Sequence, residues 1–219
     1  MFGYIMHIPD AFIPLPQAAV YWIIALIFLA LAIKWARSEL NEDKIPIIAV
    51  LAAGIFALQS FNLPVSMGTS GHLVGGALAA IVLGSPFAAV FILTLVLIIQ
   101  GFIFGDGGIT TMGANIINMG VIGGFVGFYS YKGLLKAIKN PFISAGIAAW
   151  LACLIPALAC AVEMAIAGTF PLVPGLVAMG IYHAIIGVIE GIVTALVIYI
   201  LYVSRPDLID SSIREGVPA

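Results

Sequence analysis

The stretch HLVGGALAAIVLGSPFAAVFILTLVLIIQGFIF, residues 72–104, decides how many times this chain crosses a membrane. It is far longer than the roughly 20 apolar residues that one spanning helix needs. Gly84, Ser85 and Pro86 interrupt it, since Ser85 can cap a new helix and Pro86 suits its first turn. We therefore predict two helices here, and we expect the first, which is rich in Gly and Ala, to be enclosed by other helices.

The chain as a whole has the composition of a membrane protein. Of its 219 residues, 63% are hydrophobic and 8% are charged, whereas a soluble domain has about 25% charged residues. The mean hydropathy is +1.22. We predict an all-α integral membrane protein, a bundle of seven transmembrane helices over 17–36, 45–63, 72–84, 86–104, 114–131, 142–168 and 174–203. The bundle is a single domain over 1–205, followed by a loose, polar cytoplasmic tail over 206–219.

The basic residues support the count of seven. Cytoplasmic loops of membrane proteins carry the excess of Lys and Arg. With seven spans and the amino terminus outside, all 8 basic residues fall on the cytoplasmic side, whereas six spans would separate the group at 34–44 from the group at 132–139. The basic residues are Lys34, Arg37, Lys44, Lys132, Lys136, Lys139, Arg205 and Arg214. The amino terminus is therefore expected outside and the carboxyl terminus in the cytoplasm.

The segments that then face outward contain no Lys or Arg. These are 1–16, 64–71, 105–113 and 169–173, and they hold His7, Asp10, Thr69, Ser70, Asp106 and Thr110, with His72 at the mouth of the third helix. A neutral or acidic face with two histidines suits a cation that arrives from outside. Ordinary solvated loops would have the same composition, so charge leaves both interpretations open.

Several polar side chains lie inside or near the ends of the predicted helices. Gln59, Asn62, Gln100, Asn115 and Asn118 are amides that lipid cannot satisfy. They either surround a site or join helices to one another.

His183 and Glu190 share one face of the last helix, two turns apart. Ionisable groups inside a membrane are costly and are usually paired or functional. Both a structural pair and a functional pair are compatible with this spacing. Overlapping GxxxG pairs at 120–127 indicate close helix contacts, for internal packing or for docking to a partner membrane protein.

Some functions have no support in the sequence. The motifs GxxxxGK[ST], HExxH and GxSxG do not occur, so the chain does not hydrolyse ATP through a phosphate-binding loop, and an enzymatic function has little support. The net charge of −2 provides no basic surface for nucleic acid.

Four spaced motifs resemble one known family. They are MHIPDAF (6–12), NLPVSMGTSGHLVGG (62–76), GDGGITTMGANIINMG (105–120) and His183 followed by GVIEG (187–191). Together they are similar to the CbiM/NikM family, the substrate-binding membrane subunits of energy-coupling-factor transporters for cobalt and nickel. The resemblance covers nearly the whole chain.

The resemblance implies a metal site built from Met6, His7 and His72. The ligands would be the terminal amine, the amide nitrogen and imidazole of His7, and the imidazole of His72. Such planar nitrogen coordination suits Ni²⁺, and low-spin Co²⁺ tolerates it. The ion is cargo, and no cofactor is expected. Supporting positions are expected at Asp10, Asn62, Thr69, Ser70, Asp106, Asn115 and Asn118.

The resemblance also implies partners and a location. The expected partners are a transmembrane coupling subunit, two cytosolic ATPase subunits and a small accessory membrane protein, in the cell membrane of a prokaryote. Two alternatives stay open: a related binding subunit for a vitamin or other small molecule, and a polytopic membrane enzyme that uses His183 and Glu190. The sequence does not choose between cobalt and nickel.

The chain departs from the family pattern at its start. The family begins with Met-His, whereas here Met-His stands at residues 6–7. A peptide bond to Ile5 would convert the nitrogen of Met6 from an amine into an amide and remove the preferred ligand. We therefore expect translation to start at Met6, or the residues before it to be removed.

Overall fold

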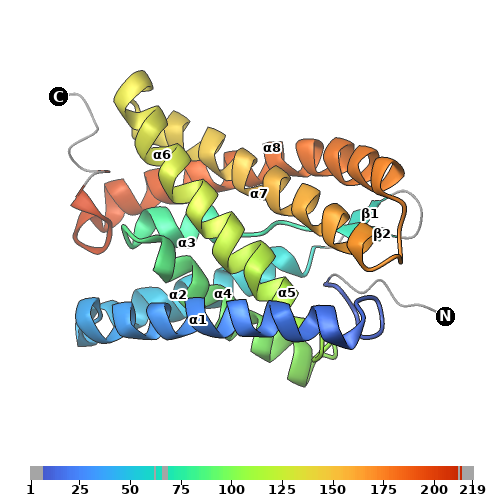
Figure 1. Ribbon diagram of the computed structural model, residues 1–219. Coiled ribbons are helices and arrows are strands. Elements are labelled where there is room, and N and C mark those ends of the chain that lie inside the picture. Colours follow the sequence, from blue (N-terminus) through green and yellow to red (C-terminus); the bar gives the residue numbers. More distant parts are fainter. Residues whose placement is uncertain (1–6, 62, 66–68, 212, 214–219) are drawn as a thin grey trace.

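The computed structural model describes residues 7–61, 63–65, 69–211 and 213. In these ranges the chain forms a bundle of helices with one small hairpin (Figure 1). The elements are α1 (Leu15–Glu39), η1 (Glu42–Lys44), α2 (Ile45–Gln59), β1 (Leu63–Val65), β2 (Thr69–Gly71), α3 (Gly76–Val82), α4 (Pro86–Ile103), α5 (Met112–Asn115), the π-helix η3 (Ile116–Gly123), α6 (Gly124–Ile138), α7 (Pro141–Ile166), α8 (Leu172–Ser204) and η4 (Pro206–Leu208).

Each predicted range contains a helix, but only some of the helices have the length of a full span. In the described part of the chain, 5 helical segments are long and apolar enough to cross a membrane: α1, α4, the continuous segment Met112–Ile138, α7 and α8. The helix predicted over 45–63 ends at Gln59, and residues 63–65 pair with 69–71 as β1 and β2. The helix predicted over 72–84 is reduced to α3, which has 7 residues.

The break before α4 forms as the sequence predicts. The Ser85 hydroxyl accepts a hydrogen bond from the amide of Phe87, Pro86 occupies the first turn, and Gly84 takes a left-handed conformation with φ of 68°. This turn allows α3 and α4 to be packed as separate helices. All seven residues of α3 are buried, which confirms that other helices enclose it.

The predicted GxxxG faces pack inside the bundle. A Cβ atom at Gly124 would lie 2.5 Å from the Cβ of Ala89 in α4, and one at Gly127 would lie 2.6 Å from the Cβ of Ala77 in α3. Both contacts join helices of this chain. Glycine at these positions lets the helix backbones approach closely.

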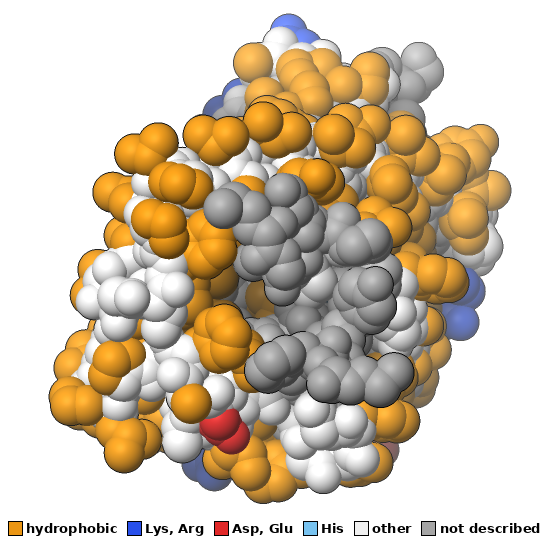
Figure 2. All heavy atoms as spheres, turned by 90° about the vertical axis from the view of Figure 1, so that its right-hand side faces the viewer, with side chains coloured by type: hydrophobic (Ala, Val, Ile, Leu, Met, Phe, Trp, Pro, Cys, Tyr) orange, Lys and Arg blue, Asp and Glu red, His pale blue; other side chains and the backbone are white. Residues whose placement is uncertain are grey.

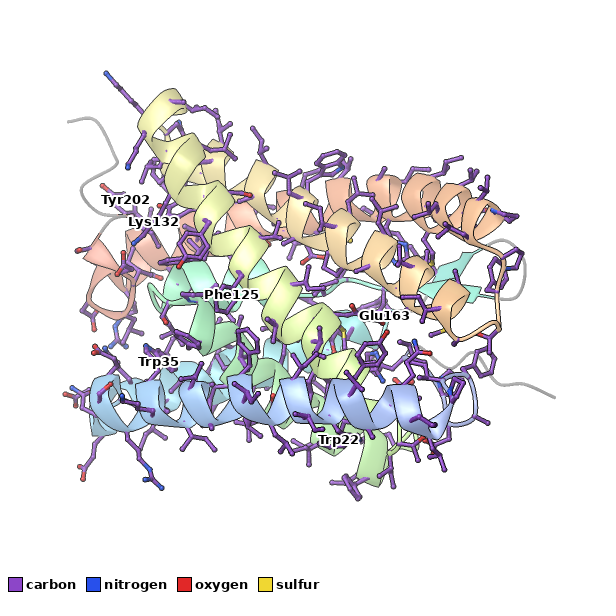
Figure 3. All side chains as sticks on the ribbon, in the orientation of Figure 1. Trp22, Trp35, Phe125, Lys132, Glu163 and Tyr202 are labelled. Atoms are coloured by element: carbon purple, nitrogen blue, oxygen red, sulfur yellow. The ribbon has the colours of Figure 1, made fainter. Side chains whose placement is uncertain are left out.

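The two ends of the bundle differ. We call the end that carries β1, β2 and the loops 104–111 and 167–171 the hairpin end. The described part of the amino-terminal segment lies here, and α8 ends at the opposite end (Figure 1), where Lys132 is also seen (Figure 3). Viewed from the hairpin end, hydrophobic and uncharged side chains dominate, and Lys and Arg appear only at the margins (Figure 2).

The tail after α8 is partly packed, contrary to the expectation that it is loose. Ile209 is 4% exposed and Ile213 is fully buried. The amide of Asp210 donates to the carbonyl of Val82 at 3.0 Å, at the end of α3. These two isoleucines give the polar tail an apolar face, which covers the turn between α3 and α4.

Candidate functional site

A small cavity lies inside the bundle near the hairpin end. Its volume is about 70 Å³. The lining residues come from the amino-terminal segment, β2, the following extended segment, α5, the π-helix η3, α7 and α8: His7, Ile8, Ser70, His72, Val74, Asn115, Asn118, Met119, Cys153, Pro156, Ala157, Cys160, Met179 and His183. All three histidines of the chain therefore border one cavity.

The amino-terminal segment is held in the bundle through the backbone of Ile8. The side-chain oxygen of Asn115 accepts from the Ile8 amide at 3.1 Å, and the Asn115 amide group donates to the Ile8 carbonyl at 3.3 Å. The Thr111 hydroxyl and the Gly108 amide donate to the same carbonyl, at 2.5 and 3.0 Å. Four hydrogen bonds to the backbone of this one residue hold the position of His7, the preceding residue.

A chain of buried amides determines the tautomer of His7. A backbone carbonyl only accepts hydrogen bonds, so the Gln59 group 2.8 Å from the Val74 carbonyl is the NH₂ group. The Gln59 oxygen then accepts from the NH₂ group of Gln100 at 3.0 Å. The remaining Gln100 oxygen lies 2.9 Å from Nε2 of His7, which therefore carries the proton. The lone pair of the His7 ring is consequently on Nδ1.

His72 has the complementary tautomer. Its Nδ1 lies 2.8 Å from the carbonyl of Leu73, so Nδ1 donates and the ring lone pair is on Nε2. The His7 and His72 rings meet edge to face, with centroids 4.8 Å apart and an interplanar angle of 88°. Two imidazole rings thus lie side by side, and neutral imidazole is a common metal ligand.

Burial keeps His7 neutral. His7 is 4% exposed, and burial, together with the neighbouring His72, lowers its pKa from 6.5 to about 3, although the hydrogen bond to Gln100 opposes this shift. The carboxylate of Asp106 lies 3.8 Å from Nε2 of His7, which is beyond hydrogen-bond distance. The imidazole of His7 is therefore neutral at neutral pH and can bind a metal ion without losing a proton.

Glu190 positions the segment that carries His72. Its two carboxylate oxygens accept from the amides of Val74 and Gly75, each at 2.8 Å. Gly75 then begins α3 with a left-handed φ of 79°. Extended backbone at membrane depth needs such internal partners, because lipid offers none.

His183 and Glu190 make their described hydrogen bonds with different partners. Nδ1 of His183 lies 3.0 Å from the carbonyl of Met179, within α8. His183 borders the cavity, whereas Glu190 binds the backbone of the extended segment. The spacing of the two residues on one helix face therefore does not bring them together as a pair.

The supporting positions have several roles. Asp10 accepts from the amide and the hydroxyl of Thr110, at 2.8 and 2.5 Å, and the hydroxyl contact is the main cause that lowers the Asp10 pKa. Asp10 thus ties the amino-terminal segment to the loop before α5. Ser70 borders the cavity, and Asn118 donates to Glu163 at 2.7 Å.

Three predicted positions cannot be placed in full. Met6 and Asn62 lie outside the described residues, and Thr69 is placed only as part of the backbone of β2. Among the described residues, no three side chains of His, Cys, Asp or Glu are arranged to hold a metal ion. A metal site at His7 and His72 therefore needs backbone nitrogens as further ligands.

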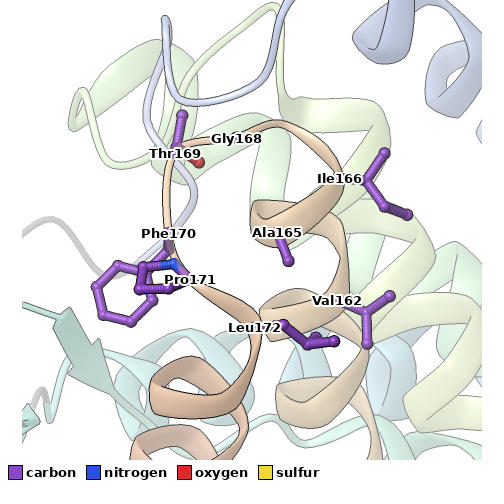
Figure 4. A pocket seen from close by; sticks show the side chains of 8 residues that line it. All are labelled: Val162, Ala165, Ile166, Gly168, Thr169, Phe170, Pro171 and Leu172. Carbon is purple, nitrogen blue, oxygen red and sulfur yellow. The ribbon is translucent and has the colours of Figure 1, made fainter.

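A larger hollow lies at the loop between α7 and α8. Its volume is about 620 Å³ (Figure 4). It is lined by Val162, Ala165, Ile166, Gly168, Thr169, Phe170, Pro171 and Leu172. Its lining includes no acidic, histidine or sulfur ligand and only one aromatic ring. It suits neither a metal ion nor the aromatic-lined pocket that a vitamin-binding subunit predicts.

Sequence reasoning did not single out Glu163 or Thr111. Glu163 in α7 is 7% exposed and binds Asn118; Figure 3 labels it in the interior of the bundle. The signal was present, because an acidic residue inside an apolar helix is a candidate for function. Thr111 has no such signal, since its contact with Ile8 depends on tertiary structure.

Known proteins are similar to this chain in sequence and in fold. The sequence model of the family described as "CbiM: Cobalt uptake substrate-specific transmembrane region" matches residues 7–208. The chain is 35% identical over 210 residues to "Cobalt transport protein CbiM" of Acetohalobium arabaticum, covering 90% of this chain and 82% of the relative.

A fused relative and a solved structure agree with this match. "Fused nickel transport protein NikMN" of Rhodobacter capsulatus is 35% identical over 222 residues, with 93% of this chain and 64% of the relative covered. A solved structure described as "Crystal Structure of an Truncated Transition metal Transporter" aligns with a TM-score of 0.85 and 32% identity, over 90% of this chain and 98% of that one.

Proposed function

Because the chain belongs to the family of cobalt-uptake substrate-specific transmembrane regions, we propose that it captures Co²⁺ or Ni²⁺ at its hairpin end with His7 and His72. Membership of the family makes it a membrane protein of metal transport. The capture site, the donor atoms, the topology and the coupling to ATP are the proposal. The tautomers of His7 and His72, which set their lone pairs on Nδ1 and Nε2, are the observation that carries it.

The lone pair on Nδ1 of His7 has a specific chemical consequence. A metal ion that replaces the proton on the amide nitrogen of one histidine and also binds its Nδ1 closes a six-membered ring, whereas Nε2 is too far from that amide. The Gln59–Gln100 chain holds the proton on Nε2 and so supports the chelating tautomer. A free amine at Met6 would close a second, five-membered ring, and Nε2 of His72 would complete four nitrogens. Such a planar nitrogen set suits Ni²⁺.

The proposed topology has seven passes with the hairpin end outside. In addition to the five long helices, α2 (15 residues) and α3 together with its extended lead segment would cross as shorter passes, of which α3 is enclosed by other helices. Support comes from the positions of Lys and Arg, which favour the opposite end as cytoplasmic. The location that follows is the cell membrane of a prokaryote, with an outward-facing metal site.

Energy for transport would come from partner subunits. The proposed partners are a transmembrane coupling subunit, two cytosolic ATPase subunits and a small accessory membrane protein. The lack of a phosphate-binding motif in this chain supports the assignment of ATP hydrolysis to others. This chain would bind and release the ion and catalyse no reaction.

Titration of the purified protein with Ni²⁺ and Co²⁺ tests the site. We expect wild type to bind one ion, and His7→Ala and His72→Ala each to lose 100-fold or more in affinity. Gln17→Leu is a control, because Gln17 contacts Tyr21 and the Glu163 carbonyl and does not border the cavity. Full affinity in both histidine variants would remove the proposed site.

The source of the terminal amine needs a separate measurement. Intact mass or amino-terminal sequencing of protein from its native host determines whether the chain starts at Met6. We expect a start at Met6. Tight nickel binding by a chain that retains Met1 would contradict the terminal amine as a ligand. The His7→Ala and His72→Ala variants would then test the two imidazole ligands separately.

A further inference from the structure

The turn after α4 holds an acidic side chain beside the ring of His7. The amide of Asp106 donates to the carbonyl of Gln100 at 2.9 Å, in the last turn of α4. Gly105 and Gly107, on either side of Asp106, have left-handed φ angles of 65° and 90°. Glycine adopts this conformation without the strain that a side chain causes. The sequence Gly-Asp-Gly therefore suits a sharp turn that fixes the position of Asp106.

Gly107 also makes the close approach to His7 possible. A Cβ atom at Gly107 would lie 2.8 Å from the Cβ of His7, well inside the roughly 3.5–4.0 Å at which carbon atoms pack. The missing side chain lets the adjoining carboxylate of Asp106 lie 3.8 Å from Nε2 of His7. The Asp106 side chain is 13% exposed and that of His7 is 1% exposed, so the two groups are only weakly screened by solvent and salt.

The carboxylate of Asp106 lies beside the ring nitrogen that does not bind the ion. In the proposed site the metal binds Nδ1 of His7, whereas Asp106 lies beside Nε2. Nε2 already donates to the oxygen of Gln100 at 2.9 Å. Asp106 is therefore placed to act on the ion through its charge, and neither as a ligand nor as the acceptor of the Nε2 proton.

The proposed complex needs an opposite charge. A divalent ion that replaces the amide proton of His7, and is otherwise held by neutral nitrogens, leaves one net positive charge in a buried site. Such a charge is costly unless an opposite charge lies nearby. Other acidic side chains in this part of the bundle bind other groups. Asp10 binds Thr110, Glu163 binds Asn118, and Glu190 binds the amides of Val74 and Gly75.

We propose that Asp106 is the counter-charge of the metal site, because its carboxylate balances the positive charge that bound Co²⁺ or Ni²⁺ leaves next to His7. This inference rests on the proposed function and adds a positioning residue that acts on the ion without touching it. An opposite charge within about 4–6 Å stabilises a charged group. A carboxylate beside a ligating imidazole also makes the imidazole a stronger electron donor to the metal.

Three substitutions at Asp106 separate its charge from its hydrogen-bonding capacity. Asp106→Asn keeps the shape and one acceptor oxygen but removes the charge, Asp106→Ala removes both, and Asp106→Glu keeps the charge. The probe is Ni²⁺ alone, titrated calorimetrically into the purified full chain as its host produces it. The visible absorption of the bound nickel reports on the ligand set. Asp43→Asn is the control, because it removes an equal charge from an exposed position in η1.

We expect Asp106→Asn and Asp106→Ala to weaken nickel binding by similar factors, about 10–100-fold. Asp106→Glu binds more tightly than Asp106→Asn, because the charge is restored. The nickel spectrum of Asp106→Asn stays that of wild type, because no ligand is lost, and Asp43→Asn keeps full affinity. Thermal unfolding without metal identifies a variant that fails to fold, and Asp106→Ser then replaces Asp106→Asn.

Three results would overturn the counter-charge. An affinity of Asp106→Asn equal to that of wild type would show that the charge is not needed. An affinity of Asp106→Glu no higher than that of Asp106→Asn would show the same, and a changed nickel spectrum in Asp106→Asn would assign Asp106 to the ligand set. Failure of the proposed function is distinguishable, since His7→Ala and His72→Ala would then keep full affinity, whatever Asp106 does.

Discussion

Gln100 sets the tautomer of His7, which lies 93 positions away in the sequence. Its oxygen accepts the Nε2 proton of His7, and its NH₂ group is held by Gln59. Gln100 is 1% exposed, so water does not compete for these contacts. A metal ligand is commonly oriented in this way by a residue that does not touch the metal.

We predict that Gln100→Leu weakens nickel binding by about 10–100-fold, the usual cost of losing a group that orients a ligand. Without the acceptor, the His7 ring can rotate and can carry its proton on Nδ1. Isothermal titration checks the affinity, and Gln17→Leu is the matched control. Equal affinities in the two variants would show that the amide chain does not orient His7.

The sequence singled out the histidines of the proposed site but not their protonation. The motifs identify His7 and His72, and the structure places them edge to face. The tautomers depend on carbonyls and amides that are brought together only by folding. No pattern in the sequence specifies which nitrogen of a histidine carries the proton.

At the scale of elements, Glu190 of α8 explains why α3 is so short. It binds the backbone of residues that are 116 and 115 positions away in the sequence. The sequence of the apolar run at 72–84 predicts one helix. The hydrogen bonds that keep Val74 and Gly75 out of this helix come from a distant side chain, which the local sequence does not reveal. By contrast, Ser85 and Pro86 start α4 by local contacts, which is why that boundary was predictable.

We predict that Glu190→Gln lowers the free energy of unfolding by about 1–3 kcal/mol, the cost of an unsatisfied buried group. A glutamine retains one acceptor oxygen but turns an NH₂ group toward the second backbone amide. Denaturant unfolding in detergent measures the change. Glu39→Gln at the exposed end of α1 should stay within about 0.5 kcal/mol. A similar small change in both variants would contradict the role of Glu190.

For the whole molecule, the proposed orientation can be measured directly. The distribution of Lys and Arg predicts that the hairpin end is outside, and this orientation stays a prediction. In a background with Cys153→Ser and Cys160→Ala, single cysteines replace Thr169 at the hairpin end and Ser38 at the opposite end. Both positions are exposed.

A membrane-impermeant maleimide applied to intact cells should label Thr169→Cys and spare Ser38→Cys, which reacts only after the membrane is permeabilised. The physical reason is that the charged reagent does not enter lipid. The reversed pattern would place the metal site at the cytoplasmic face and exclude capture from outside.

The central claim is that His7 and His72 bind the metal ion, through Nδ1 and Nε2 respectively. Anomalous diffraction at the nickel edge, from crystals with one equivalent of Ni²⁺, tests it most directly. We predict one strong peak at the hairpin end, bonded to Nδ1 of His7 and Nε2 of His72. A peak held instead by the carboxylates of Asp10 or Asp106, or by the opposite ring nitrogens, would contradict the account.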